Sequence, residues 1–244
     1  MNPAEYEIMF NVETEHWWYK NLHMMIDEAI NNSMATNHER ILDAGCGTGA
    51  VVERIASRHL VTGLDFSPLA LQFTRRRVSV NLARGSVAGL PFKSGTFGAV
   101  VSLDVISHVD AGPAADSMAE LARVLRPGGL LILNVPAFAW MRSPHDVQVR
   151  TGHRFTRGEI LALFSGAGLR TEYCTYWNTL LMPAIIGARI VKRIVRSQSS
   201  DLTHYGPGIG ARVCSAVLAV ERRLLRMGPL PVGVSLFAIA RKPE

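Results

Sequence analysis

The sequence is poor in the features that would assign it to a specialised class of protein. Its 244 residues include only three cysteines, Cys46, Cys174 and Cys214, an odd number without the paired spacing of a metal site. We therefore expect neither a disulfide framework nor a bound metal, and we expect a reducing, cytoplasmic environment. Charged residues make up only 19% of the chain, whereas hydrophobic residues reach 48%. This balance predicts a soluble globular protein that buries a full core.

Long apolar runs are also missing, and we expect no targeting leader. The longest apolar stretch, residues 180–191, is interrupted by Pro183 and Arg189 and is too short to span a bilayer. The opening residues MNPAEYEIMF are mixed and acidic, unlike the basic start and apolar run of a secretory signal. At this length we expect one large α/β domain, without stable insertion into a membrane.

Acidic residues are the minority among the charged ones. The chain has 26 lysines and arginines against 20 aspartates and glutamates, which gives a net charge of +6. Part of this excess falls in residues 189–196 and at Arg222, Arg223 and Arg226. Such clusters would suit an anionic partner, such as nucleic acid or a membrane surface. We adopt the simpler interpretation, a solvated face of amphipathic helices, and we expect no nucleic-acid partner.

Strand-like and helix-like segments alternate from residue 41 onward. Apolar runs predict strands at residues 41–44, 60–65, 78–84, 98–104 and 130–135. Helices are predicted at residues 48–57, from Pro68 with Ser67 as its N-cap, and at 114–125. This alternation predicts an α/β fold with a doubly wound parallel sheet. Ligands of such sheets bind outside the carboxyl ends of the strands.

The pattern changes after residue 136. Thr156 and Glu159 form the T-x-x-E of a capping box, which predicts a helix to about Gly166. The later segments are predicted as a strand at 169–177, an amphipathic helix at 180–195, a loop at 206–210, a helix to about Met227 and a strand at 232–243. We expect the last strand to pair antiparallel with residues 169–177.

A glycine-rich segment follows the first predicted strand. Asp43, Gly45, Gly47 and Gly49 form D-x-G-x-G-x-G, which lets a ligand approach the backbone where a helix begins. This spacing differs from the dinucleotide fingerprint G-x-G-x-x-G. Asp65 ends the second strand about twenty residues later and is suited to accept hydrogen bonds from both hydroxyls of a ribose. The sequence therefore predicts a nucleoside site, and no diphosphate.

Four segments together carry a family resemblance. They are LDAGCGTG at 42–49, GLDFSPLAL at 63–71, GSVAGLPFKSGTFGAVVSLDVISHV at 85–109 and VLRPGGLLILNVP at 124–136. In this order they resemble the motifs of class I, Rossmann-fold S-adenosylmethionine-dependent methyltransferases. EHWWYK, SPHD, GHRFT and LPVGVSLFAIARKP also resemble the type 11/12-like branch, whose members methylate small molecules.

The resemblance implies a fold and a division of the chain. The sheet would have seven strands in the order 3-2-1-4-5-7-6, with strand 7 antiparallel. Residues 1–38 would form an N-terminal helical lid, and residues 39–244 the S-adenosylmethionine-binding domain. A helical insertion at 180–227, between strands 6 and 7, would cover the acceptor pocket, form a homodimer interface, or lie on a membrane through a basic face.

The resemblance also implies which residues hold S-adenosylmethionine. Asp43, Gly45 and Gly47 would line its methionine moiety, Asp65 its ribose, and Phe66, Ser86 and Val87 its adenine. Leu103 and Asp104 would face the methyl group. The full predicted set is Trp18, Tyr19, Asp43, Gly45, Cys46, Gly47, Asp65, Phe66, Ser86, Val87, Leu103, Asp104 and His108.

Candidate catalytic residues follow the fifth strand. His145 and Asp146 are adjacent, and His153 precedes Arg154. A histidine beside a carboxylate is held in one tautomer and titrates near neutrality, so these residues are candidates for a general base. The alternative is a loop-stabilising network of hydrogen bonds and charges. A base is needed only if the methyl acceptor arrives protonated.

The predicted activity is methyl transfer to an O, N or C nucleophile of a small, largely apolar or aromatic molecule. SLDVIS ends the fourth strand in place of the signature of nucleobase amine methyltransferases. One alternative is a quinone- or lipid-precursor methyltransferase in peripheral contact with a membrane. Another is a nicotinamide-dependent oxidoreductase, which the glycine spacing opposes. The third is a non-catalytic S-adenosylmethionine binder, because relatives carry an acid at Ser86 and arginines at Leu22 and His23.

Overall fold

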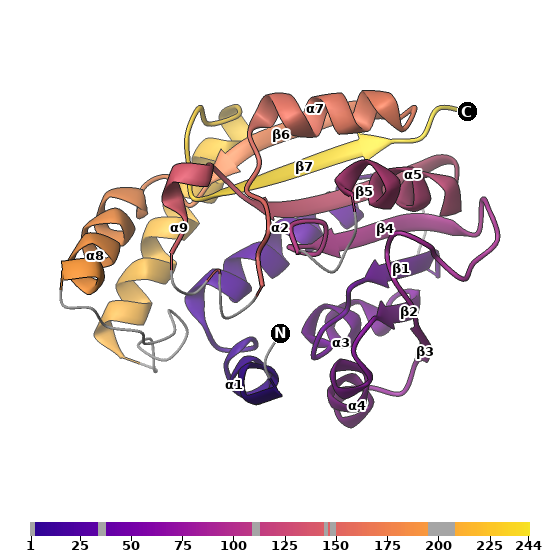
Figure 1. The fold of residues 1–244 in the computed structure, drawn as a ribbon, viewed down its shortest axis with the longest axis horizontal. Coiled ribbons are helices and arrows are strands. Elements are labelled where there is room, and N and C mark those ends of the chain that lie inside the picture. Colours follow the sequence, from indigo (N-terminus) through magenta and orange to yellow (C-terminus); the bar gives the residue numbers. More distant parts are fainter. Residues whose placement is uncertain (1–2, 34–37, 109–112, 144–145, 147–149, 195–207) are drawn as a thin grey trace.

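The computed structural model contains a seven-stranded sheet in the order β3-β2-β1-β4-β5-β7-β6 (Figure 1). It describes residues 3–33, 38–108, 113–143, 146, 150–194 and 208–244. The strands are β1 Arg40–Ala44, β2 Leu60–Asp65, β3 Asn81–Arg84, β4 Phe97–Leu103, β5 Leu125–Pro136, β6 Arg170–Trp177 and β7 Ser235–Arg241. β7 runs antiparallel to both β5 and β6, and the other neighbours are parallel. The predicted strand order and the antiparallel last strand are confirmed.

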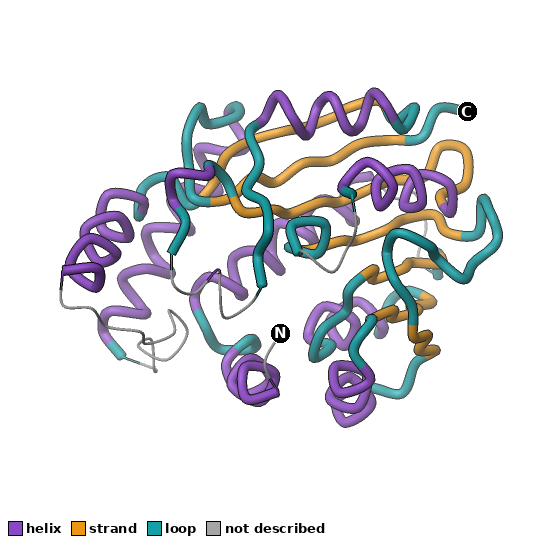
Figure 2. Tube along the Cα trace, viewed as in Figure 1, coloured by secondary structure: helices purple, strands orange, loops and turns teal. Residues whose placement is uncertain are grey.

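Helices cover both faces of the sheet (Figure 2). They are α1 Pro3–Val12, α2 Trp17–Ser33, α3 Ala50–Ala56, α4 Pro68–Arg77, α5 Ala114–Val124, α7 Arg157–Gly166, α8 Met182–Ile194 and α9 Ile209–Met227, with a 3-10 turn at Ala139–Met141. On one face α5 and α7 pack on the sheet, and on the other α2, α3 and α9 do so. Two apolar layers explain why β1, β4 and β5 are nearly continuous apolar runs.

Two successive residues of β1 belong to different apolar layers. Leu42 belongs to the core under α5 and α7, whereas Ile41 belongs to the core under α2, α3 and α9. Both side chains are fully buried. Because successive side chains of a strand point to opposite faces, this short run fills both cores at once.

Three strands start three or more residues from their predicted positions: β3, β5 and β7, the last of which starts at Ser235 instead of residue 232. β5 begins at Leu125, five residues before the predicted start, because Leu125 pairs with Phe97 of β4. The register then shifts, and Gly128, with a φ of +72°, lies in this irregular part of the strand. The Arg-Pro-Gly-Gly segment therefore ends α5 but belongs to a strand. β3 is shorter than predicted and starts at Asn81.

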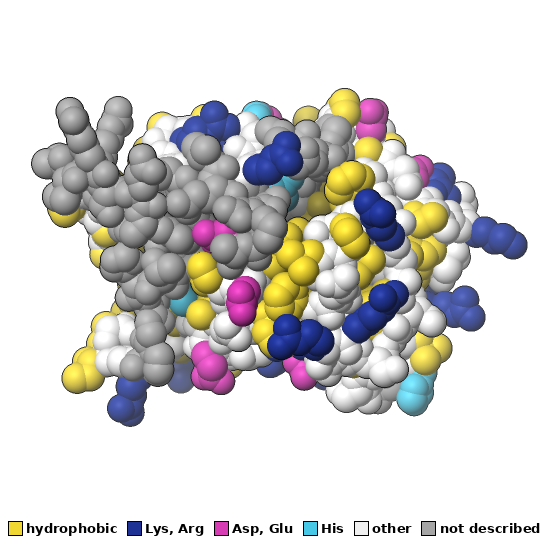
Figure 3. All heavy atoms as spheres, turned by 60° about the horizontal axis from the view of Figure 1, so that its bottom comes forward, with side chains coloured by type: hydrophobic (Ala, Val, Ile, Leu, Met, Phe, Trp, Pro, Cys, Tyr) yellow, Lys and Arg dark blue, Asp and Glu magenta, His cyan; other side chains and the backbone are white. Residues whose placement is uncertain are grey.

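The N-terminal helices lie beside the part of the sheet that carries α4. The helical lead-in consists of α1 and α2, and α1 packs on α4 through Tyr6 and Phe73. Figure 3 turns the lower side of Figure 1 forward, where hydrophobic side chains form a band between acidic and basic ones.

The late helices α8 and α9 lie between β6 and β7 in sequence, and α9 packs on α2. Among the described helices, none is long and apolar enough to cross a membrane.

The helix caps predicted at Ser67 and Thr156 are both confirmed. The Ser67 hydroxyl accepts a hydrogen bond from the Ala70 amide, with Pro68 at the first helical position of α4. Thr156 accepts from the Glu159 amide while the Glu159 carboxylate accepts from the Thr156 amide at 2.7 Å. Each contact satisfies an amide that the first turn of a helix leaves without an intrahelical partner.

Replacing Thr156 by alanine is expected to lower the free energy of unfolding by about 1 kcal/mol, because the first turn of α7 loses its cap. Urea denaturation measures this change. Thr156→Ala and Glu159→Ala should also cost less together than the sum of the two, since they belong to one reciprocal contact. Additive effects would show that the two side chains act independently.

Candidate active site

A cavity of about 660 Å³ opens at the edge of the sheet where the parallel strands end. Segments after β1, β2, β3 and β4 form one wall, and α1, α2 and α8 contribute others. All thirteen residues predicted to hold a cofactor line it: Trp18, Tyr19, Asp43, Gly45, Cys46, Gly47, Asp65, Phe66, Ser86, Val87, Leu103, Asp104 and His108. Its volume lies within the range of about 300–1,000 Å³ typical of small-molecule sites.

The glycine loop after β1 brings main chain to the cavity surface. Gly45 has a φ of +95°, and a Cβ atom there would lie 2.1 Å from Cγ2 of Val105. Only glycine fits both the conformation and the space. The Asp65 carboxylate braces this loop, because it accepts hydrogen bonds from the amides of Gly47 at 3.0 Å and Ser67 at 2.8 Å. Ser86, at the neighbouring strand end, accepts from the Ala88 amide.

Buried carboxyl groups give the cavity its electrostatic character. Burial, together with the nearby carboxylates of Asp65 and Glu13, raises the pKa of Asp43 to about 8. Burial likewise raises the pKa of Glu13 to about 7 and that of Asp104 to about 7, although hydrogen bonds oppose both shifts. Burial also raises the pKa of Asp65. A cation at this place would favour the ionised carboxylates, so the site suits a positively charged ligand.

Asp104 is held in place by two residues from distant strands. Both of its carboxylate oxygens accept from Nδ2 of Asn134, at 3.0 and 3.1 Å. Nε1 of Trp177 donates to Oδ1 of Asn134 at 2.8 Å, which fixes the orientation of the amide. Asp104 has a φ of +58°, a conformation that aspartate adopts at some cost. The only sequence signal for this network was the single polar residue, Asn134, inside LLILNV.

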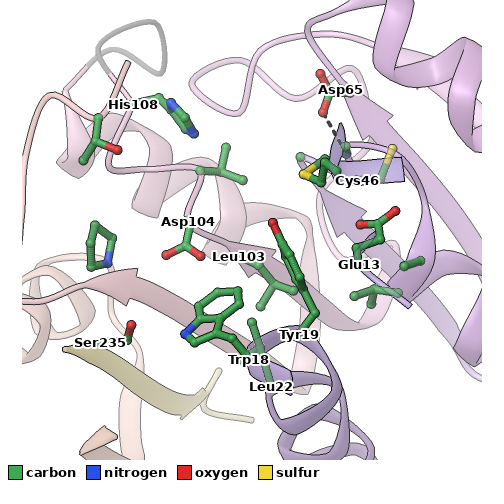
Figure 4. A pocket seen from close by; sticks show the side chains of 18 of the residues that line it. Glu13, Trp18, Tyr19, Leu22, Cys46, Asp65, Leu103, Asp104, His108 and Ser235 are labelled. Atoms are coloured by element: carbon green, nitrogen blue, oxygen red, sulfur yellow. Dashed lines mark hydrogen bonds between the residues drawn. The ribbon is translucent and has the colours of Figure 1, made fainter. Parts of the chain in front are cut away.

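Aromatic side chains from α2 form another part of the wall. Trp18 stacks on Trp177 with ring centroids 5.4 Å apart, and it meets Tyr19 edge to face at 5.0 Å. In Figure 4 the Tyr19 hydroxyl points into the cavity, between the sides occupied by Asp65 and Asp104. Burial raises the pKa of Tyr19, so its phenol remains a hydrogen-bond donor at neutral pH.

The turn between α1 and α2 is hydrogen-bonded to the glycine loop, a contact that no sequence pattern predicted. Glu13 accepts a hydrogen bond from the Thr48 hydroxyl and pairs with Arg77 at 2.9 Å. Nε of Arg77 also donates to the Thr48 carbonyl at 2.9 Å. His16, from the same turn, lines the cavity, and burial lowers its pKa to about 4. The contact joins residues more than thirty positions apart, so local spacing carries no sign of it.

The candidate catalytic residues do not form one group. His145 lies outside the described residues. Asp146 lines the cavity, but it is buried in an ion pair with Arg154 at 2.8 Å and also accepts from the Ser143 amide. His153 is an exposed partner of Glu159 at 2.9 Å and is not among the described residues that line the cavity. The structure thus places Asp146 in an ion pair at the cavity wall and His153 on the surface, and the catalytic role of these residues stays a prediction.

The remaining wall comes from segments far away in sequence. Asn178 follows β6, Val234 precedes β7, and Ser235 begins β7. The start of β7 lies at the same sheet edge because β7 is antiparallel. Ile185 and Arg189 of α8 also line the cavity, and Nη1 of Arg189 donates to the Met141 carbonyl at 2.5 Å. No motif singled out Ile185 and Arg189, because only the packing of α8 brings them here.

Comparison with known proteins supports the resemblance. A family model described as a methyltransferase domain matches residues 41–129. A probable S-adenosylmethionine-dependent methyltransferase of Mycolicibacterium smegmatis is 28% identical over 162 residues, covering 65% of this chain and 61% of that protein. A demethylmenaquinone methyltransferase of Tropheryma whipplei is 34% identical over 105 residues, covering 40% and 42%. The chain thus spans about three-fifths or less of the length of these relatives.

A solved structure extends the likeness of fold to nearly the whole chain. It is a chain of the complex between the Haloferax volcanii Trm112 methyltransferase activator and the putative methyltransferase. The TM-score is 0.63 at 18% identity, covering 99% of this chain and 95% of that one. The matched domain, the strand order and the glycine loop on one sheet edge together support the similarity of this chain to the class I, Rossmann-fold S-adenosylmethionine-dependent methyltransferases.

Proposed function

We propose that the protein transfers a methyl group from S-adenosylmethionine to an O, N or C nucleophile of a small, largely apolar or aromatic molecule. One observation carries this proposal. A single cavity is floored by a glycine loop, lined by buried carboxyl groups and closed by tryptophan and tyrosine. Acids suit the cationic cofactor, and the aromatic and aliphatic wall suits an apolar acceptor.

The residues present fit S-adenosylmethionine. Asp43 is 2% exposed and would hold the ammonium group, while the backbone at Gly45 leaves room that a side chain would fill. Asp65 would accept from the ribose hydroxyls with the lone pairs that the two amides leave available. Phe66 and Ser86 would border the adenine. When bound, the cofactor supplies a methyl group on a positively charged sulfur.

The chain's own contribution to the reaction is chiefly orientation. Holding a nucleophile in line with the methyl group can lower the barrier by up to about 7–11 kcal/mol. Leu103 and Asp104 end β4 at the cavity, and Trp18 and Tyr19 face them from α2 (Figure 4). Asp104, with its pKa near 7 and its fixed carboxylate, is suited to take a proton from an acceptor hydroxyl or ammonium.

In the proposed function the helical segments cover the cavity. Residues 1–38 act as a lid, supported by the contact of Glu13 with Thr48 and Arg77 beside the glycine loop. The α8 helix covers the acceptor side through Ile185 and Arg189. A quinone- or lipid-precursor acceptor is the second candidate. The demethylmenaquinone methyltransferase among the relatives and the apolar wall favour it.

Turnover tests the function directly. The purified protein is incubated with S-adenosylmethionine and a panel of phenolic, amine and quinone-like acceptors, and products heavier by one methylene are sought by mass spectrometry. A methylated product identifies the acceptor class. Tight cofactor binding without turnover across a broad panel would favour the non-catalytic binder, and absence of cofactor binding would refute both.

Asp65→Ala is expected to weaken binding of S-adenosylhomocysteine by about 1.5–3 kcal/mol, because hydrogen bonds to a charged acceptor are lost. Isothermal titration calorimetry measures the change. Asp116→Ala on the exposed surface of α5 is the matched control and should bind like the parent. Unchanged affinity in Asp65→Ala, with an unaltered melting temperature, would mean that the ribose lies elsewhere.

Binding of S-adenosylhomocysteine should strengthen as the pH rises from 6 to 8. The ligand's ammonium group requires an ionised Asp43, whose pKa in the free chain is about 8, so binding releases a proton. Asp43→Asn should reduce the number of protons released by about one. Calorimetry in two buffers of different ionisation enthalpy measures it. An unchanged proton count in the variant would remove Asp43 from the ligand contact.

A further inference from the structure

The excess of positive over negative charge falls in one part of the chain. Residues 180–227, the connection between β6 and β7, contain eight of the 26 lysines and arginines and two of the 20 acids. The rest of the chain therefore carries 18 basic and 18 acidic residues, which cancel. The whole net charge of +6 belongs to the segment that contains α8 and α9.

One face of α9 is firmly attached to the rest of the protein. Leu218 and Leu225 are buried in the core against α2. Glu221, also buried, accepts from the amide of Asn178 and from that of Leu180 at 2.8 Å. The Tyr173 hydroxyl donates to the Leu225 carbonyl at 2.9 Å. These contacts fix the helix and therefore decide which face it turns outward.

The outward face of α9 is apolar along its whole length. Five large hydrophobic side chains, which we call the α9 stripe, are between 38% and 85% exposed: Ile209, Val213, Val220, Leu224 and Met227. Their spacings of four, seven, four and three residues place them on one side of a helix. At about 1.5 Å per residue the stripe is roughly 27 Å long. Exposure of a row of apolar side chains to water is unfavourable.

Basic residues flank the α9 stripe on one side. Arg212 and Arg223 are exposed, and at 100° per residue they lie next to the stripe, away from the buried face. Neither makes an ion pair within the part of the chain that the structure describes. Arg222 and Arg226 instead contact Asn21 and Glu28 of α2. The only acid of α9 is the buried Glu221.

We propose that the α9 stripe, with Arg212 and Arg223, docks the protein onto the surface of an anionic lipid bilayer. A helix with an apolar row beside arginines lies in the interfacial plane, its apolar side chains among the acyl chains and its arginines on acidic headgroups. The helix does not cross the membrane. The proposal is independent of the methyl-transfer activity, although docking would bring the α8 side of the cavity near membrane-dissolved acceptors.

Charge complementarity favours lipid over other occupants. A second copy of this face would meet the arginines without offering a carboxylate in return, since α9 exposes no acid. Nucleic acid would pair with the arginines but would leave the apolar row in water. Acidic headgroups above an acyl layer satisfy both features together.

Sedimentation with vesicles tests the docking. The full chain, without cofactor, is mixed with vesicles of phosphatidylcholine alone or of equal parts phosphatidylcholine and phosphatidylglycerol. We expect binding to the anionic vesicles only, weakened by added salt. Arg212→Glu with Arg223→Glu should weaken binding by about tenfold or more, and Val220→Asp with Leu224→Asp should do likewise. Melting temperatures check that the variants remain folded.

The matched control reverses the same number of charges elsewhere. Arg75→Glu with Lys93→Glu changes two exposed residues outside the insertion and should keep most of the binding. Equal loss in the control would show attraction by net charge alone and overturn the site. Equal binding to neutral vesicles, or no binding to either, would also overturn it. Dissociation of a dimer by Val220→Asp with Leu224→Asp, without vesicle binding, would assign the stripe to a second copy.

Discussion

The burial of carboxyl groups at one edge of the sheet is the constraint on which the site depends. Parallel β1, β2 and β4 end at this edge, so Asp43, Asp65 and Asp104 face a common cavity, where Asp43 is buried and the other two are half-buried. Burial of each acid opposes its ionisation, and the neighbouring acids add to the effect on Asp43. A site of this kind is incomplete without a cation, which the proposed cofactor provides.

Much of the surrounding structure serves to position these acids. Asp65 is anchored by two backbone amides, and Asp104 by Asn134, itself oriented by Trp177. Glu13 is fixed by Thr48 and Arg77, so the N-terminal helices are tied to the glycine loop. The buried pair of Asp146 and Arg154 stabilises the loop after β5 by neutralising two charges that would be costly alone.

The two helices between β6 and β7 face different surroundings. Ile185 and Arg189 of α8 turn toward the cavity, whereas the α9 stripe turns to solvent. Arg189 of this segment lies at the cavity, whereas Arg212 and Arg223 lie beside the α9 stripe and do not line the cavity. The site for a cationic cofactor and the surface for an anionic partner can therefore exist in one small protein, at separate places.

The sequence by itself determined the features that depend on local spacing. β2 at residues 60–65, the caps at Ser67 and Thr156, and the glycine loop follow from periodicity, side-chain hydrogen bonding and the conformational freedom of glycine. Strand order and the residues of the cofactor side both followed from the family resemblance. Only the tertiary structure decided which distant groups meet: Asn134 with Asp104, Glu13 with Thr48, and His153 with Glu159 instead of the cavity. Such contacts depend on how helices pack across the sheet, and no spacing along the chain encodes them.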